Sequence, residues 1–242
     1  GAGVSLMLGP GVGTSFAVAG MTSARGRSHT FDARADGYAR GEACCGAALR
    51  GGADDAGAVR LHGCAVRQDG RSASLTAPNG QAQQGLLRAA LADAAAAAEA
   101  LAVAEAHGTG TSLGDPIEAG SLAASVLSAR APSPSPLAVG GVKANIGHAE
   151  PAAGMTGLLR LALALGRAAA APNAQLRVLN QHVGDALRGA ACALPTQLAL
   201  QPVAAGAGGV SSFGYSGPVA HAVLLHPRGG PAAPRPRAGA GG

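Results

Sequence analysis

The sequence predicts an α/β fold, and two observations favour this class. Short apolar segments typical of buried strands alternate along the chain with longer Ala- and Leu-rich segments of helical periodicity. The composition of the 242 residues also suits closely packed layers, because 48% are hydrophobic but only 2% are aromatic, and 39 are glycine. This length is enough for one sizeable domain or two small ones with a real core.

Strands and turns are predicted for the first seventy residues. Each predicted strand is a short apolar run, and each turn contains glycine, which interrupts regular structure. In order, they are a small apolar segment at 4–8, a turn at 9–11, a buried strand at 41–50, a turn at 51–57, a strand at 59–67 and a turn at 68–70.

The middle of the chain is predicted to alternate helix and strand. The Ala, Leu and Gln pattern indicates a helix over 79–101, and residues 101–106 are a short apolar strand. A Gly- and Thr-rich loop follows. Asp115 then precedes Pro116, a pair typical of a helix that begins with an N-cap side chain and a proline at its first position.

The same alternation continues to residue 226. The predicted elements are a Pro/Ser loop at 131–136, a strand at 137–142, a helix over 150–170, and strands at 198–203, 209–212 and 219–225. Residues 227–242 contain only Pro, Gly, Ala and Arg and have no apolar periodicity, which predicts a linker or tail.

Charge and apolar patterning exclude nucleic acid and membrane as partners. The net charge is +5, but the arginines are scattered singly and aromatic side chains that could stack on bases are nearly absent. The longer apolar segments carry charged residues such as Asp93 and Arg160, so no run is long enough to span a bilayer.

The cysteines give no sign of a metal site or a disulfide framework. Cys44, Cys45, Cys64 and Cys192 form neither a CxxC pair nor a Cys/His zinc pattern. We therefore expect a reducing, intracellular and most simply cytoplasmic location. Because the chain begins at Gly1 without Met or a leader segment, we also expect it to be a piece of a longer protein.

Three segments share an arrangement that favours chemistry. In each, an apolar strand leads into a polar, Gly-rich loop, at 104–111, 143–150 and 211–217. The carboxyl ends of strands are where ligands meet open α/β folds. Neutral His107 and His148 could stabilise negative charge on a carbonyl oxygen there, although either histidine taken alone is better explained by packing or surface exposure, and it is their combination with Lys143 that favours catalysis. The helix start at Pro151 would favour the neutral form of His148.

Lys143 is the only lysine in a chain whose other basic side chains are arginine, apart from seven histidines. A lysine kept against this bias indicates a place where the planar guanidinium cannot serve, with chance survival as the alternative.

These segments resemble the signatures of β-ketoacyl synthases, specifically the ketosynthase domains of type I polyketide synthases. Residues 107–118 read HGTGTSLGDPIE, residues 143–148 read KANIGH, and residues 211–217 read SSFGYSG, each similar to a family motif. Segments at 30–32, 36–38, 40–42, 68–72 and 75–80 also match, and the resemblance runs from residue 1 to about residue 227.

The resemblance implies a thiolase-like fold of αβαβα layers and a decarboxylative Claisen condensation. In this family a cysteine thiol takes an acyl chain from acyl carrier protein. A malonyl-type extender on the carrier's phosphopantetheine arm then loses carbon dioxide, and the resulting carbanion attacks the thioester. No cofactor is bound directly. The expected partners are the acyl carrier protein, the neighbouring polyketide synthase domains and, in the complete domain, a second copy.

The resemblance also assigns roles to site residues. His107 and His148 become the active-site histidines that support decarboxylation and stabilise the enolate oxygen. Lys143 is assigned to the catalytic group and would organise the charges of the second histidine loop together with Glu150, with Asn145 as a supporting residue.

Four further residues are expected at the substrate by the same resemblance. Thr109 and Thr111 would contact the pantetheine arm. Phe213 and Tyr215 lie on the loop that lines the acyl pocket, and the backbone amide of Tyr215 matches the family's second oxyanion donor.

The sequence departs from the family pattern at two places. No TACSS-like turn with the nucleophilic cysteine occurs, and Cys44 and Cys45 match a structural strand downstream of it. The family continues the third loop as GTNAH, whereas Pro218 and Val219 here remove an amide, a hydroxyl and a polar side chain.

The resemblance divides the chain into three parts and leaves three functions open. Residues 1–57 would end the N-terminal ketosynthase half, 58–226 would form the C-terminal half, and 227–242 would be a linker or tail. The chain is then an incomplete condensing domain, a degenerate ketosynthase-like domain that binds carrier or partner domains, or an unrelated basic binding module.

Overall fold

A computed structural model describes residues 1–51, 59–70, 77–130, 135–200 and 206–227. The centre of these residues is a mixed six-stranded sheet. In spatial order its strands are β3 (Arg60–Gln68), β10 (Pro218–Leu225), β9 (Ala207–Phe213), β4 (Leu101–Glu105), β5 (Leu137–Gly140) and β7 (Cys192–Ala193). Strand β10 is antiparallel to both neighbours, whereas β9, β4, β5 and β7 run parallel.

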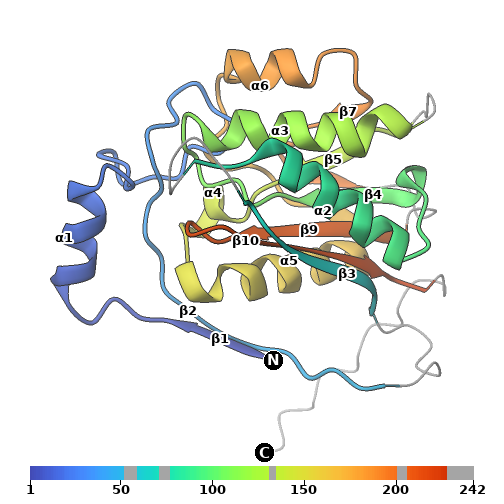
Figure 1. Cartoon of the computed structure of the whole chain (residues 1–242), viewed down its shortest axis with the longest axis horizontal. Coiled ribbons are helices and arrows are strands. Elements are labelled where there is room, and N and C mark those ends of the chain that lie inside the picture. The colour runs from blue at the N-terminus through green and yellow to red at the C-terminus, as the bar shows by residue number, and fades with distance from the viewer. Residues whose placement is uncertain (52–58, 71–76, 131–134, 201–205, 228–242) are drawn as a thin grey trace, which may run out of the picture.

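Helices cover both faces of this sheet, and a second small sheet lies beyond one of them (Figure 1). On one side lie α2 (Gly80–Asp93), α3 (Gly114–Ser125) and, beyond α3, α6 (Gln181–Ala186). On the other side lies α5 (Ala153–Arg167), with β1 (Ala2–Ser5) and β2 (Ala43–Gly46) beneath it. This succession of helices, sheet, helix and sheet confirms the layered α/β fold expected from the sequence.

Small apolar side chains form the two interfaces between sheet and helices. Helix α5 buries Ala153, Gly157, Leu161 and Leu165, which share one helical face, and Leu161 packs with Val210 of β9. On the opposite face of the sheet, the α2 residues Leu87 and Ala90 and the α3 residue Ala119 pack in a cluster with strand residues such as Val139 and Val223. The parallel strands are therefore covered on both sides, as their continuous apolar sequence requires.

The N-terminal arm differs from the prediction in two respects. Residues 10–18 form helix α1 (Pro10–Val18), where only a turn was expected, because Pro10 suits the first turn of a helix. No residue of α1 is buried, so it has none of the apolar periodicity that sequence reasoning detects. The predicted buried strand at 41–50 is also wrong: β2 spans only Ala43–Gly46, pairs with β1 alone among the residues described, and leaves Cys44 exposed.

Two predicted helix ends are wrong for local reasons. Asn79 does cap α2 through bonds from the amides of Gln81 and Ala82, but the helix ends at Asp93 and the positive φ of Ala95 turns the chain back toward β4. Helix α3 begins at Gly114, so Asp115 is inside its first turn and makes no cap; its carboxylate is used elsewhere.

The remaining predictions hold within a few residues where the structure describes them. Strands were expected at β3, β4, β5, β9 and β10, and the helix expected over 150–170 is a 3₁₀ turn at Glu150–Ala152 followed by α5. The elements not predicted are the short α4 (Lys143–Ile146), α6, β6 (Ala169–Ala170) and β7. Of the strand expected at 198–203, β8 (Ala199–Leu200) is seen.

Some predictions lie mainly outside the described residues. These are the turn at 51–57, the loop at 131–136 and the tail at 227–242. Among the residues described, no helix combines the length and apolar character needed to cross a membrane.

Candidate active site

The three histidine-bearing or Gly-rich loops follow strands whose parallel course brings their carboxyl ends to one edge of the sheet. Strand β4 lies between β5 and β9, with Glu105 level with Gly140 on one side and Val210 on the other. The loops after these strands therefore start side by side. This arrangement explains how residues far apart in sequence reach one site.

His107 lies between the other two loops. Its ring is edge-on to the ring of His148, with centroids 5.6 Å apart and planes at 85°, and it is tilted against the Phe213 ring at 5.3 Å. The amide of Phe213 donates to His107 Nδ1 at 3.2 Å. Because Nδ1 accepts this bond, the neutral ring carries its proton on Nε2.

His148 is held in the same manner by a different amide. The amide of Glu150 donates to His148 Nδ1 at 2.8 Å, so this neutral ring also carries its proton on Nε2. The Tyr38 ring packs against the His148 ring with centroids 4.8 Å apart. Both histidines are thus arranged as hydrogen-bond donors through Nε2.

Buried carboxylates hold the His107 loop in shape. The carboxylate of Glu118 accepts from the amides of His107 and Gly108 at 2.7 and 2.8 Å. The carboxylate of Asp115 accepts from the amides of Gly110 and Phe31 at 3.1 and 2.7 Å. Glycine is required at position 110, since its φ is +77° and an added Cβ would lie 2.6 Å from the backbone nitrogen of His29.

Lys143 connects the two histidine loops. Its side chain is only 3% exposed, and Nζ donates to the His107 carbonyl oxygen at 2.6 Å. Burial lowers the pKa of Lys143 to about 8, while the nearby carboxylates of Glu118 and Asp115 oppose that shift. Lys143 therefore fixes the backbone of one histidine from the start of the loop that bears the other.

Burial keeps both histidines neutral. It lowers the pKa of His107 well below the ordinary value and that of His148 to about 3, and the charge of Lys143 adds to both shifts. The pKa of Asp115 rises to about 7 for the same reason, because burial disfavours its anion. At neutral pH the two imidazoles are donors that add no charge of their own.

The turn that precedes Lys143 is fixed by a second buried network. Glu105 accepts from the amide of Val142 at 2.6 Å and pairs with Arg160. The Asn173 side chain accepts from the amide of Gly141 at 2.9 Å and donates to the Val139 and Pro195 carbonyls. These bonds satisfy the amides of Gly141 and Val142 and the carbonyl of Val139 within the protein.

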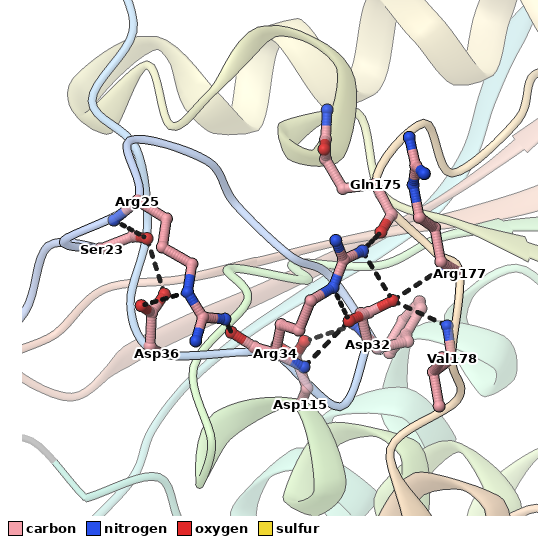
Figure 2. Close-up of polar contacts among 10 residues, drawn as sticks. Ser23, Arg25, Asp32, Arg34, Asp36, Asp115, Gln175, Arg177 and Val178 are labelled. Atoms are coloured by element: carbon pink, nitrogen blue, oxygen red, sulfur yellow. Dashed lines mark hydrogen bonds and ion pairs between the residues drawn. The ribbon is translucent and has the colours of Figure 1, made fainter.

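Asp32 fixes the N-terminal segment to the stretch that contains Arg177 and Val178 (Figure 2). This fully buried carboxylate accepts from the Arg34 guanidinium and from the amides of Arg34, Arg177 and Val178. Burial alone would raise the pKa of Asp32, but these hydrogen bonds hold it well below its usual value. Nearby, the Thr30 hydroxyl donates to the Gly108 carbonyl at 2.7 Å, which joins the segment to the His107 loop.

The other predicted site residues lie around this centre with different exposures. The hydroxyls of Thr109 and Thr111 are 3.3 Å apart, and Thr111 Oγ1 also accepts from the Gly114 amide. Asn145 is exposed, and Tyr215 is 61% exposed at the tip of the β9–β10 hairpin. The carboxylate of Glu150 makes a two-pronged ion pair with Arg40.

The hairpin forms despite Pro218. The Gly214 amide donates to the Pro218 carbonyl at 2.7 Å, and Val219 pairs with Phe213 in register. Pro218 is the first residue of β10, a position that proline tolerates.

The four cysteines all lie on strands and are free thiols. Cys44 and Cys45 are in β2, Cys64 is in β3 and Cys192 is in β7. Cys45 Sγ lies 3.6 Å from the hydroxyl of Thr156. Within the described parts of the chain, no group of three or more His, Cys, Asp or Glu side chains is placed to hold a metal ion.

Two protein-family models match this chain. The model of the β-ketoacyl synthase C-terminal domain matches residues 58–177, and that of the N-terminal domain matches residues 1–54. The chain belongs to the β-ketoacyl synthase family. It is 43% identical over 250 residues to a phenolphthiocerol/phthiocerol polyketide synthase of Mycobacterium tuberculosis, covering 99% of this chain and 11% of that protein.

Further relatives place this β-ketoacyl synthase chain among ketosynthase domains of polyketide synthases. Squalestatin tetraketide synthase of Phoma sp. is 36% identical over 230 residues, or 92% of this chain and 9% of that protein. The ketosynthase from module 6 of the Bacillus subtilis bacillaene synthase superposes with a TM-score of 0.81 at 29% identity, covering 94% of this chain and 42% of that one. The oxazolomycin ketosynthase domain of Streptomyces albus superposes with a TM-score of 0.80 at 28% identity, covering 94% of this chain and 41% of that one. The chain thus spans about two fifths of the solved ketosynthases and about a tenth of the curated relatives.

Sequence reasoning missed several residues that shape this β-ketoacyl synthase site. Tyr38 and Arg40 contact the second histidine loop, and Thr30 contacts the first, yet they were used only to recognise the family. No motif or periodic pattern in the sequence marks Asn173 as a site residue. Tyr38, Arg40 and Thr30 could have been recognised as site residues, because the motifs that contain them are as distinctive as the histidine motifs.

Proposed function

We propose that this chain supplies the two donor histidines of a β-ketoacyl synthase, which joins an acyl thioester to a malonyl-type extender with loss of carbon dioxide. The observation that carries the proposal is the pair of amide bonds to Nδ1 of His107 and His148, which leaves Nε2–H as the donor on both rings. Neutral donors in a buried site stabilise an oxyanion without first having to lose or gain a proton.

The bond between the extender's α-carbon and its carboxylate breaks, carbon dioxide leaves, and the electron pair becomes an enolate of the thioester. His107 and His148 donate to that enolate oxygen. The α-carbon then attacks the acyl thioester carbonyl, a carbon–carbon bond forms, and the cysteine thiolate departs and is later reprotonated.

The substrate roles of the other residues belong to the same proposal. Thr109 and Thr111 would contact the phosphopantetheine arm, Phe213 would line the acyl pocket, and the amide of Tyr215 would serve the second oxyanion. The exposure of Tyr215 and the partial exposure of Thr109 and Thr111 support access from outside the sheet.

The proposed setting is a multidomain synthase. We expect acyl carrier protein and neighbouring synthase domains as partners, a homodimer of the complete domain, and a cytoplasmic location. The proposed division at residues 57 and 58 is supported by the change from one family model to the other between residues 54 and 58.

The test uses a chimera in which this chain replaces the matched part of the bacillaene module 6 ketosynthase. Release of carbon dioxide from a malonyl carrier and acylation of the cysteine are measured separately. His107→Ala and His148→Ala should each slow decarboxylation about a hundredfold, or roughly 3 kcal/mol of barrier. Acylation should suffer less, since its negative charge develops at the other oxyanion site.

The matched control is His182→Ala, because His182 is an exposed histidine on α6. It should leave both rates unchanged. Undiminished decarboxylation in His148→Ala would overturn the assignment of this loop, and tolerance of Gln at both histidines would favour a packing role.

A non-condensing domain that binds carrier or partner domains is the second candidate. It is favoured by the positions of the four cysteines, all on paired strands rather than in a nucleophile turn. Under either function, this chain by itself should release no condensed product from carrier-bound acyl and malonyl groups. Product from the isolated 242 residues would contradict both accounts.

A further inference from the structure

The segment that contains Tyr38 and Arg40 runs beside the second histidine loop and is bonded to it by backbone groups. The amide of His148 donates to the Ala39 carbonyl at 2.7 Å, and the amide of Gly41 donates to the His148 carbonyl at 2.8 Å. The two stretches thus pair like parallel strands at Arg40 and His148. This pairing fixes the backbone of His148 but does not by itself orient its ring.

The Arg40 side chain makes the second connection, to Glu150. Arg40 Nε and Nη2 donate to the two carboxylate oxygens of Glu150 at 2.7 and 3.0 Å, and both side chains are less than one fifth exposed. A two-pronged pair of this kind fixes the direction of the carboxylate as well as its distance. The guanidinium also lies over the Phe16 ring of α1, 5.7 Å from its centroid.

The backbone of Glu150 is held in an unfavourable conformation. Its φ is +43°, in the left-handed region that a residue with a Cβ seldom adopts. Such a conformation persists only when the surroundings impose it. The Arg40 pair is a contact that can impose it, since Glu150 has no other ion pair among those seen in the described residues.

This strained residue is also the one whose amide orients the His148 ring. The Glu150 amide donates to His148 Nδ1, so relaxation of the Glu150 backbone would turn that amide away from the ring. We infer that Arg40 is a positioning residue for His148: through the Arg40–Glu150 ion pair it holds the Glu150 amide on Nδ1 and keeps Nε2–H as the donor. The catalytic meaning of this inference rests on the proposed function, but the positioning itself does not.

Positioning and simple charge effects predict opposite results for the loss of Glu150, but the same direction for the loss of Arg40. Tyr38, His107 and Lys143 also face His148, and replacement of Arg40 or Glu150 alters none of these three residues. By charge alone, loss of Arg40 would raise the pKa of His148 and loss of Glu150 would lower it. By positioning, either loss frees Nδ1 from the amide and lets water reach the ring, so either loss raises the pKa.

The experiment measures the pKa of His148 by NMR in the 242-residue chain labelled with ¹⁵N at its histidines. Arg40→Gln and Glu150→Gln should each raise that pKa by at least one unit, and Arg40→Lys should raise it partly because an ammonium makes no two-pronged pair. The combined change Arg40→Glu with Glu150→Arg should bring it back toward the starting value.

His107 is the internal control for folding, since its Nδ1 is held by Phe213 and not by Glu150. Its pKa should not rise in any variant, since a charged His148 lowers it, whereas general loosening would raise the pKa of both histidines. Arg188→Gln, which removes the exposed ion pair between Arg188 and Asp185 at the end of α6, is the matched arginine control and should shift the pKa of neither histidine. Opposite shifts for Arg40→Gln and Glu150→Gln, or equal shifts of His107 and His148, would overturn the inference.

A second readout in the chimera separates this inference from the proposed function. Arg40→Gln should lower kcat for malonyl decarboxylation about tenfold with little change in KM, and the charge swap should restore much of it. A chimera without decarboxylation whose His148 pKa still follows Arg40 would refute the function and keep the positioning. A decarboxylating chimera with kcat unchanged by Arg40→Gln would refute the catalytic role of the positioning and keep the function.

Discussion

Lys143 and His107 are joined by one short hydrogen bond, in which the buried ammonium donates to the backbone carbonyl of the histidine at 2.6 Å. The ammonium therefore holds His107 in position through its backbone, and its charge also lowers the pKa of the ring. Since Lys143 starts the loop that bears His148, the bond also sets the spacing of the two rings, which are 5.6 Å apart. A compact donor suits this place, because the surrounding side chains leave Lys143 only 3% exposed.

Lys143→Arg should therefore be harmful although the charge is kept. The planar guanidinium is larger and cannot place one donor on the His107 carbonyl without moving a loop. We expect the free energy of unfolding to fall by about 2 kcal/mol, as for overpacking of a core, and decarboxylation in the chimera to slow. Chemical denaturation and the decarboxylation assay measure the two effects. A silent Lys143→Arg would mean that lysine is here by chance.

Lys143→Met tests the charge separately. It removes the positive charge that opposes protonation of both histidines, so the pKa of His148 should rise above about 3 but stay below 6.5, since burial is the larger cause of its shift. NMR titration of the labelled histidines measures this. The pKa of His221, for which burial is the only cause of the shift, serves as the control and should not move. An unchanged His148 pKa would show that Lys143 acts only through its hydrogen bond.

The histidine loops were predictable because two signals coincide in them. The strands before His107 and His148 are short and apolar, and the loops after them carry the family motifs. The contacts of Tyr38 and Arg40 with the second loop leave no periodic signal, since they join segments far apart in sequence. Only the fold brings such segments together.

Other elements were mispredicted for reasons of burial. Helix α1 buries nothing, so it shows none of the apolar pattern by which helices are recognised. Conversely, the apolar run around Cys44 and Cys45 predicts a buried strand, yet in the described part of the chain it pairs only with β1 and leaves Cys44 exposed. Asp115 has the sequence of an N-cap, but long-range bonds from the amides of Phe31 and Gly110 take its carboxylate.

The exposed apolar residues of the N-terminal arm should bind a hydrophobic dye. Leu8 and Val18 are 87% and 85% exposed, and Val12 is 53% exposed, which is a large apolar area for a free surface. Replacing all three by Ser should reduce dye fluorescence without lowering the free energy of unfolding, because none is part of either core cluster.

The matched control for the dye experiment is Leu200→Ser, a single exposed apolar residue outside the arm at 82%. It should change dye binding little. A chain that melts sharply and binds no dye would contradict the prediction that the arm is a free apolar surface.

Asp32→Asn should destabilise the fold, and more so at neutral than at acid pH. The hydrogen bonds from Arg34, Arg177 and Val178 depress the pKa of Asp32 below its unfolded value, so their stabilisation is present above that unfolded value and is lost as pH falls through the folded pKa. We expect a loss of roughly 2 kcal/mol at pH 7, less than for a fully buried pair because Arg34 is partly screened by solvent.

Urea denaturation of both chains at pH 7 and pH 3 measures the Asp32 effect, and the difference between them should shrink at pH 3. Asp36→Asn is the control, since Asp36 pairs with Arg25 at the surface and should change the unfolding free energy by less than about 1 kcal/mol. A difference that does not depend on pH would mean that the shape of Asp32, and not its charge, is what matters.

His221 should make the fold sensitive to acid. It is 6% exposed, its Nδ1 lies 2.9 Å from the Ser211 hydroxyl, and burial lowers its pKa to about 4. Because the folded pKa lies below the unfolded one, the unfolded chain binds the additional proton, and stability falls as pH drops from about 6.5 to 4, by about 1.4 kcal/mol per pH unit for this one proton.

His221→Asn should remove that slope whatever it does to stability at neutral pH. The unfolding free energy of the unchanged chain minus that of His221→Asn should therefore fall as pH drops from about 6.5 to 4, and the contributions of His107 and His148 cancel in this difference. His182→Asn, which changes an exposed histidine, should give a curve parallel to that of the unchanged chain. If the His221→Asn curve is also parallel, His221 is not the group whose protonation opposes folding, and the β9–β10 pair is stable to acid for another reason.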